Sequence, residues 1–553
     1  MRTLPAPMSL TALSVLSVSA LLLLGACGDK DGGSGDGGDD TDVDGDDGGD
    51  DGGDDGGDDG GDDGGDDGGD DTGPLPDDPP SITADVEWVE GAWGAEVTFN
   101  VTIDDEDPAG VSLDAVMGDD LIIGGFTDST WTGTAGSDSA TTTITITATD
   151  AAGQTGTLEL PVEVYAERTW TGVIALQGPV DEVLGPDFGV GSDGWTYIAG
   201  YLGNTGLATG INAAGDLAWN QFYSDYSEIG RGISYDEETG IAAYSAQYRV
   251  SGSTQAARLA GLDAAGEQWT STANYVSSGY TAGYLVHAAD GVVAQGGPMM
   301  DTSAGLTGSW GRLVDANTGA GIGDVILFMA HPTAANQPSS VQVMADGKVL
   351  ASGWADVDYD TGAGISNHNS WVKISEPGEQ ILDFFDWLTI PGADVLLRDA
   401  HELSNGDILV AGSTTGDLEG TNAGQQDAIL RRYDAAGTVL WTVQTGGSLD
   451  DDYLRLAEGH DGALYAVGTQ DWDSDSNTQG EAVVVRYDAD GNEVWKTTLA
   501  GDGLVRGRSI EFSGRDIIVT GLTNDSIPAH DLTFAGGTWD SFMMRLDVDG
   551  NIQ

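Results

Sequence analysis

The chain of 553 residues contains a single cysteine, Cys27, and few basic residues. One cysteine excludes an intramolecular disulfide, a cysteine-based zinc site and a dithiol redox pair. Lys and Arg number 19 against 92 Asp and Glu, which gives a formal net charge of −73. Nucleic acid is therefore not an expected partner, because binding its phosphates requires clustered positive charge.

Sequence signatures of catalysis are also missing. A Gly-x-Ser-x-Gly elbow and a phosphate-binding loop ending in Lys-Ser or Lys-Thr are both absent. The six histidines show no spacing typical of metal ligands; they are His287, His331, His368, His401, His460 and His530. We therefore assign no catalytic residue from the sequence.

The N-terminus has the pattern of an export signal. Arg2 precedes an apolar stretch from about Leu10 to Leu24, which indicates a secretory signal peptide. Its closing Leu24-Gly25-Ala26-Cys27 resembles a bacterial lipobox. That resemblance implies cleavage before Cys27 and acylation of Cys27, so residues 1–27 are predicted to be a lipoprotein signal peptide. Several acyl chains would hold the protein firmly in a membrane. We expect this membrane to be the bacterial outer membrane, with the protein facing the cell surface or the periplasm.

Residues 28–79 consist almost wholly of Asp and Gly, with Asp-Asp-Gly-Gly repeated in tandem. Nothing in this stretch can bury enough apolar surface to offset the entropy lost on ordering, so it is predicted to be disordered. A Gly-rich coil of about 50 residues spans roughly 40 Å, and repulsion between carboxylates extends it further. The stretch is therefore predicted to be a tether between the membrane and the folded domains.

Residues 80–165 are predicted to form a small β-sandwich. Apolar and polar residues alternate in Val97–Ile103, Ile144–Thr147 and Leu158–Val164, which is the period of strands with one buried face. This length suits a sandwich of about seven strands. The run Thr147–Gln154, followed by a final strand, resembles bacterial immunoglobulin-like and cadherin-like repeats, which implies an Ig-like fold.

A short phrase recurs through the rest of the chain: an apolar residue, usually Asp, small or polar residues, then Gly. Its final glycines lie 51 to 59 residues apart, which indicates one repeated supersecondary unit. The seven copies are Ile211–Gly215, Leu262–Gly266, Val314–Gly319, Ile374–Gly378, Tyr433–Gly437, Tyr487–Gly491 and Leu546–Gly550.

Each phrase lies between strand patterns, and a polar-Gly hairpin turn recurs upstream of it. Four strands in about 55 residues are typical of a propeller blade. A Trp strand follows several phrases, yet only three residues follow Gly550, whereas Arg168–Ile174 is a Trp strand without a phrase before it. We therefore predict an all-β fold in which residues 166–553 form a monomeric seven-bladed β-propeller, closed by an N-terminal strand.

The stretch from Asp427 to Gly468 resembles the bacterial seven-bladed propeller repeats known as SBBP repeats, which implies an extracytoplasmic domain. The phrase followed by Trp also resembles quinoprotein dehydrogenase repeats, which hold a quinone over Ca²⁺, commonly beside a disulfide that this chain cannot form. Here Trp219, Trp269, Trp441 and Trp495 are expected to pack between blades. A further comparison is the lipid-anchored propeller scaffold of outer-membrane assembly.

Two acidic loops are candidate Ca²⁺ sites, because alternate carboxylates can wrap one hard cation. An acidic surface loop in a chain of this charge is the alternative. The candidate ligands are Asp356, Asp358 and Asp360 in one loop, and Asp471, Asp473 and Asp475 in the other.

The leading hypothesis is a non-enzymatic, lipid-anchored envelope protein whose propeller is a binding or adhesion platform for an unknown protein or glycan. An extracytoplasmic enzyme that uses the central channel is one alternative. A periplasmic assembly scaffold is the other. The role as a platform is an argument from the fold alone.

Overall fold

A computed structural model describes most of residues 78–553, and Cys27 and nearly all of the predicted tether lie outside that part. Within 78–553 the description leaves out residues 118–120, 137–139, 176–181, 203–204, 224–227, 252–253, 274, 276–278, 304, 332–335, 358–363, 376–382, 460, 515 and 535–537. In the described part, the only helical segments are two short 3₁₀ turns, η1 (Pro108–Gly110) and η2 (Pro528–His530). None of its helices could cross a membrane. The fold is all-β.

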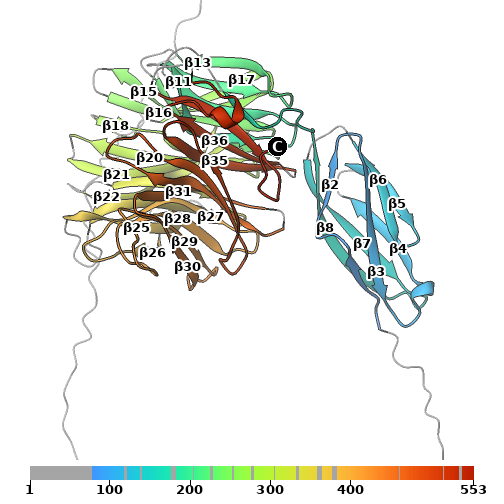
Figure 1. The fold of residues 1–553 in the computed structure, drawn as a ribbon. Helices are drawn as coiled ribbons and strands as arrows, with labels where there is room; N and C mark the ends of the chain where they lie inside the picture. Colours follow the sequence, from blue (N-terminus) through green and yellow to red (C-terminus); the bar gives the residue numbers. More distant parts are fainter. Residues whose placement is uncertain are drawn as a thin grey trace, which may run out of the picture. The chain divides into compact units, whose positions relative to one another are not determined.

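Strands β1 to β8 form two four-stranded sheets that enclose one apolar core (Figure 1). One sheet has the order β1 (Ser81–Ala84), β3 (Glu96–Asp104), β6 (Thr130–Ala135), β5 (Ile122–Thr127). The other has the order β2 (Val89–Ala92), β8 (Thr155–Tyr165), β7 (Ala140–Thr149), β4 (Ser112–Met117). Eight strands replace the seven expected, because the first segment is divided between the two sheets, with β1 in one and β2 in the other.

The following strands form antiparallel sheets in which neighbours in sequence pair with one another. Five sheets have four strands: β10 (Glu182–Val190), β11 (Thr196–Leu202), β12 (Thr205–Ile211), β13 (Leu217–Tyr223); β23 (Asn336–Val343), β24 (Val349–Val357), β25 (Gly364–Ser375), β26 (Asp383–Leu388); β27 (Val395–Glu402), β28 (Ile408–Thr414), β29 (Asp427–Tyr433), β30 (Val439–Thr445); β31 (Asp450–Glu458), β32 (Leu464–Trp472), β33 (Glu481–Tyr487), β34 (Glu493–Leu499); and β35 (Val505–Ser513), β36 (Asp516–Thr523), β37 (Asp540–Leu546), β9 (Val173–Ala175). The repeat inferred from the sequence is thus a repeat of sheets.

One larger sheet of nine strands occupies the second and third repeats. It contains β14 (Glu228–Asp236), β15 (Ile241–Ser251), β16 (Thr254–Asp263), β17 (Gly266–Ala273), β18 (Gly279–Thr281), β19 (Leu285–Ala289), β20 (Val292–Asp301), β21 (Leu306–Asp315) and β22 (Gly321–His331). The three-residue β18 joins its halves, because it pairs with β16 through Gln255 and Tyr280 and also with β20.

The series of sheets closes on itself. Strand β9 pairs antiparallel with β37. It begins at Val173, three residues after Trp170, within the segment that the sequence predicts to be the closing strand. The last sheet then packs on the first, since β10 contacts β35, β36 and β37. Ile518 and Met543 of the last sheet share one apolar core with Phe188 and Tyr197 of the first. In Figure 1 the red strands accordingly lie beside the green ones. Successive sheets that pack in a closed series form a β-propeller.

The recurring phrase forms the contact between neighbouring sheets. Gly491 has φ +82°, and a Cβ atom there would lie 2.9 Å from Cδ2 of Trp441 in the preceding sheet. The indole Nε1 of Trp441 donates a hydrogen bond to the carbonyl of Ala489, inside the same phrase, at 2.9 Å. Glycine is required there because its φ is left-handed and the indole leaves no room for a side chain.

The same contact recurs around the propeller and explains the spacing of Gly and Trp. Trp269 packs on Gly319 and Trp495 on Gly550. At the closing sheet Trp170 takes this position against Gly215 of the first sheet. In the sheet of β23–β26, Phe385 takes the position of this Trp and faces Gly437, with a ring atom 3.5 Å from the place of a Cβ there. The four tryptophans predicted to pack between sheets include Trp269, Trp441 and Trp495, which do so. The fourth, Trp219, packs against the core shared by the first and last sheets.

Candidate functional site: the axial cavity

A cavity of about 240 Å³ lies where the first strands of the repeats meet. Strands β10, β14, β19, β23, β27, β31 and β35 all contribute to its wall, so it occupies the propeller axis. This volume corresponds to roughly eight water molecules. Its charged and imidazole-bearing lining residues are Asp187, His287, Asp399, His401, Arg455, Glu458 and Glu511.

Hydrogen bonds between neighbouring first strands hold the wall together. In each, a lining side chain accepts a bond from a backbone N–H of the next strand around the axis, which fixes both the side chain and the strand. The pairs are Ser234 Oγ with Ala288 N (3.0 Å), His287 Nδ1 with Val343 N (3.2 Å), Ser340 Oγ with Ala400 N (3.0 Å), Gln342 Oε1 with Glu402 N (2.7 Å) and Asp399 Oδ2 with Leu456 N (3.0 Å).

One ion pair links strands that are not neighbours around the axis. Nε of Arg455, on β31, lies 2.9 Å from Oδ1 of Asp187, on β10. Burial lowers the pKa of the Arg455 guanidinium, but the carboxylates of Asp187 and Asp399 outweigh that effect and the pKa is raised. Arg455 therefore stays charged and provides the cavity with a fixed cation.

Two carboxyl groups of the cavity hold their protons more tightly than usual. Burial raises the pKa of Asp399 to about 6, although Arg455 opposes the shift. Burial, reinforced by repulsion from Asp187 and Asp399, raises the pKa of Glu511 to about 8. Near neutral pH Glu511 is therefore a hydrogen-bond donor as well as an acceptor.

The two histidines of the cavity are neutral at physiological pH. Burial lowers the pKa of His287 to about 4, with a further contribution from repulsion by His401. Burial also lowers the pKa of His401 to about 4. Because Nδ1 of His287 accepts the amide of Val343, its Nε2 carries the ring proton. The cavity wall thus combines one cation and several carboxylates with neutral donors and acceptors, which are features of a polar ligand site.

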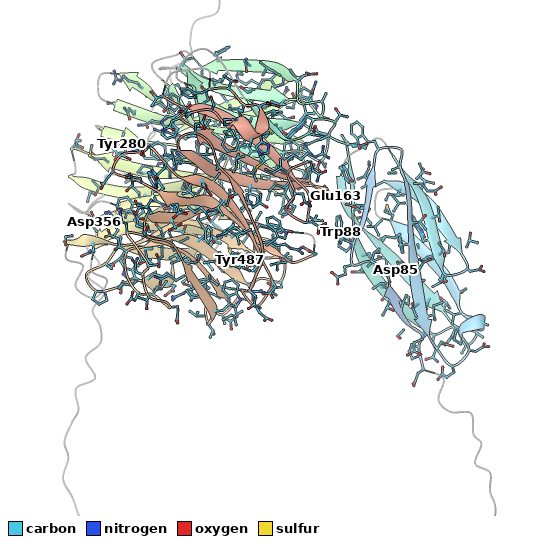
Figure 2. The ribbon with its side chains drawn as sticks, viewed as in Figure 1. Asp85, Trp88, Glu163, Tyr280, Asp356 and Tyr487 are labelled. Atoms are coloured by element: carbon cyan, nitrogen blue, oxygen red, sulfur yellow. The ribbon has the colours of Figure 1, made fainter. Side chains whose placement is uncertain are left out.

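Four of the six residues proposed as Ca²⁺ ligands do not line this cavity: Asp356, Asp471, Asp473 and Asp475. Asp356, labelled in Figure 2, is at the end of β24, where a carboxylate oxygen contacts Nδ1 of His368. Asp358 and Asp360 lie outside the described residues.

In the second loop, the carboxylate of Asp473 forms its hydrogen bonds within the loop itself. Asp473 accepts the N–H of Ser476 at 3.2 Å and its hydroxyl at 2.7 Å, and these bonds lower its pKa. The backbone N–H of Asp471 binds Asp451, and Asp475 is exposed. In the described part of the chain, no group of three or more His, Cys, Asp or Glu is arranged to hold a metal ion. Calcium binding stays a prediction.

Sequence reasoning missed the cavity residues because they do not belong to the repeated phrase. They lie on the first strand of each repeat, whose members differ most from one another. A signal was nevertheless present: Asp187, Asp399 and Arg455 each precede the first residue of a recurring hairpin turn by six positions. Charged residues at equivalent positions of otherwise apolar strands indicate a shared polar surface.

Comparison with known proteins finds no matching family model. The regulatory protein FlaEY of Caulobacter vibrioides is 27% identical over 178 residues, or 30% of this chain. The match spans 18% of that relative's length.

Similar solved structures include β-propeller domains. The propeller domain of the trilobed protease from Pyrococcus furiosus has a TM-score of 0.34 at 9% identity, covering 63% of this chain and 90% of that one. A chain of the mitotic checkpoint complex has a TM-score of 0.41 at 13% identity, covering 67% and 93%. Prolyl oligopeptidase B of Galerina marginata has a TM-score of 0.37 at 11% identity, covering 69% and 50%. The assignment of the fold comes from the pairing and packing of the sheets.

Proposed function

We propose that this chain is a lipid-anchored bacterial envelope protein whose propeller binds a small polar group, or the end of a larger ligand, in its axial cavity. The observation that carries this proposal is the cavity itself. All of the first strands line it, and it holds a fixed cation, two neutral imidazoles and a carboxyl group that is protonated near neutral pH. Enclosed polar groups of this kind orient a ligand and discriminate between ligands.

The propeller that we propose has seven blades. The nine-stranded sheet counts as two blades of four strands, β14–β17 and β19–β22, because the three-residue β18 only bridges them. Five four-stranded sheets complete the ring, and β9 supplies the outer strand of the last. Sharing the last sheet between the two ends of the propeller removes an open edge, which protects the ring against aggregation.

The other parts of the chain fit exposure outside the cytoplasm. We propose that Cys27 carries the lipid, that residues 28–79 are a tether, and that residues 80–165 are an Ig-like spacer. The two packed four-stranded sheets support the spacer, and the lipobox-like sequence supports the anchor. A tether and spacer would carry the cavity away from the crowded membrane surface.

A ligand screen tests the binding function. The full chain, purified in detergent, would be titrated with a panel of envelope glycans and peptides while its melting temperature is followed. A specific ligand should raise the melting temperature of the wild-type protein and lose this effect in Arg455→Met. Arg249→Met, which changes an exposed arginine on β15, is the matched control. Binding that is equally strong in both variants would place the ligand elsewhere and refute the cavity as its site.

An enzyme that uses the same cavity is the second candidate. The raised pKa values of Asp399 and Glu511 favour it, since general acids and bases have pKa values close to the working pH. Mass spectrometry of the glycan and peptide panel after incubation with the chain separates the two functions. Products that disappear with Glu511→Gln would establish catalysis, whereas unchanged ligands would support binding alone.

Exposure on the cell decides between an adhesion platform and a periplasmic scaffold. Protease treatment of intact cells should degrade the chain if it faces outward. Complete protection, together with co-purification of outer-membrane assembly proteins, would refute the platform and support the scaffold.

A further inference from the structure

Four arginines from three successive first strands of the repeats lie close enough to one another, beside the axial cavity, for their charges to interact. Arg398 is on β27, Arg455 on β31, and Arg506 and Arg508 on β35. Nη1 of Arg455 donates a hydrogen bond to the carbonyl of Arg398 at 3.2 Å, which joins two of these strands. The whole chain has only 19 basic residues against 92 acidic ones, so this concentration of positive charge runs against its composition.

Irregularities in the strands position two of these arginines. The register of β27 with β28 shifts between Leu397 and Asp399, so Arg398 is the additional residue of a β-bulge. The register of β35 with β36 shifts between Gly507 and Ser509, and Arg508 is the additional residue there. Bulges redirect side chains and are frequent beside functional sites. In both strands the bulge immediately precedes a residue that lines the cavity, Asp399 or Ser509.

Two of the four positive charges have a carboxylate partner. Arg455 pairs with Asp187 at 2.9 Å. Arg506 lies 3.5 Å from Asp452, and its guanidinium carbon is 3.9 Å from the ring centroid of Trp472. These contacts hold both side chains in place and compensate their charges.

The other two positive charges have no such partner among the described residues. The Nε atoms of Arg398 and Arg508 are closed to solvent, and neither makes a hydrogen bond. Burial and repulsion from Arg506 lower the pKa of Arg508 to about 9, and Asp452 only partly opposes the shift. Burial also lowers the pKa of Arg398, although Asp452 again opposes it. Because burying an uncompensated charge costs stability, this arrangement calls for a negatively charged ligand.

We propose that Arg398 and Arg508 bind a ligand group with two negative charges, a phosphate, a sulfate or a pair of carboxylates, beside the axial cavity. Two uncompensated guanidinium groups match two negative charges. Their planar donor forks suit tetrahedral and planar oxyanions alike. Arg455 and Arg506, which are already paired, border the site and add to its positive potential. The inference rests on the proposed binding function and specifies the charge of the ligand.

The test is calorimetric titration of the full chain in detergent with sodium phosphate, sulfate and malonate at constant ionic strength, with chloride and acetate as monovalent controls. At least one dianion should bind and raise the melting temperature, and the monovalent ions should not. Comparing the affinity for phosphate and sulfate with the affinity for malonate distinguishes a tetrahedral oxyanion from a pair of carboxylates. Binding should weaken at least tenfold in Arg398→Met and in Arg508→Met, and should be unchanged in Arg249→Met.

The variants also test whether these arginines are merely structural. Without an anion, Arg508→Met should melt at the wild-type temperature or above it, because the substitution removes an uncompensated charge. Arg508→Lys should keep part of the affinity for the dianion, since lysine keeps the positive charge but lacks the parallel N–H donors of the guanidinium group. A lowered melting temperature in both Met variants, no dianion binding, or dianion binding that ignores both substitutions would each overturn the proposal. Absence of dianion binding, together with a neutral ligand whose binding depends on Arg455, would leave the proposed function standing and refute only the anion site.

Discussion

The contact between sheets at the recurring phrase predicts a large effect from one added methyl group, in Gly491→Ala. A residue with a Cβ at φ +82° costs about 1–2 kcal/mol of unfolding free energy. The new methyl would lie 2.9 Å from Cδ2 and 3.0 Å from Cε3 of Trp441, so the indole must move. Moving it loosens the 2.9 Å hydrogen bond to the carbonyl of Ala489, worth about 0.5–1.5 kcal/mol net. The expected total is about 2–3 kcal/mol, measured by urea denaturation followed by circular dichroism.

Gly462→Ala is the matched control for this experiment. Gly462 has φ +71°, and no atom lies within 4 Å of the position of an added Cβ. Its substitution should cost only the backbone strain, about 1–2 kcal/mol. The difference between the two variants therefore isolates the contact with Trp441. If Gly491→Ala proves no more destabilising than Gly462→Ala, the role that we assign to the Gly–Trp contact is wrong.

Three further predictions concern the anchor, the cavity and the closure of the ring. Cys27→Ser should move the protein from the membrane to the soluble fraction; retention at the membrane would contradict lipidation. Between pH 7 and 8 the unfolding free energy should fall as pH rises, because burial raises the pKa of Glu511 to about 8 and that of Glu237 to about 7, and the folded state then holds more protons than the unfolded one. Glu511→Gln should reduce this slope in urea denaturation, whereas His287 and His401, whose pKa is about 4 in the folded state and near 6.5 in the unfolded state, contribute with the opposite sign and fade above pH 7. Trp170→Ala should cost about 3–5 kcal/mol in the same assay, because Trp170 is 7% exposed and packs on Gly215; a loss below about 1 kcal/mol would contradict closure through this contact.

The fold was largely predictable because its repeat is enforced by backbone geometry. A turn that needs a left-handed residue selects Gly, and the indole stacked against it selects Trp, so both leave a periodic trace in the sequence. The strand around Trp170 could be placed because it is a Trp strand with no phrase before it. Two features could not be predicted from such a periodic pattern. One is the division of the first sandwich segment between β1 and β2, and the other is the bridge through β18. Both depend on contacts between segments that share no pattern.

The candidate site was less predictable for the opposite physical reason. Acidic loops attract notice in a sequence, yet Asp473 satisfies its carboxylate with the backbone and hydroxyl of Ser476. The residues of the axial cavity are dispersed along the chain, and Asp187 and Arg455 are separated by 268 positions. Only closure of the ring brings them together. A single charged residue on an apolar strand carries no information about which other strand it will face.

We infer that the conserved contacts of the repeat and the proposed binding site occupy different parts of each repeat. At the position of Asp399, other first strands carry Ser340, Arg455 and Ser509, and the bulge before it holds an arginine only in some of them. The phrase and its Trp cannot vary without weakening a contact between sheets. The first strands can vary, because their backbone already bonds to the neighbouring strand and their side chains meet only at the axis. A charge placed there is held by the whole ring, so the ligand that we propose would be selected by the residues that differ between repeats.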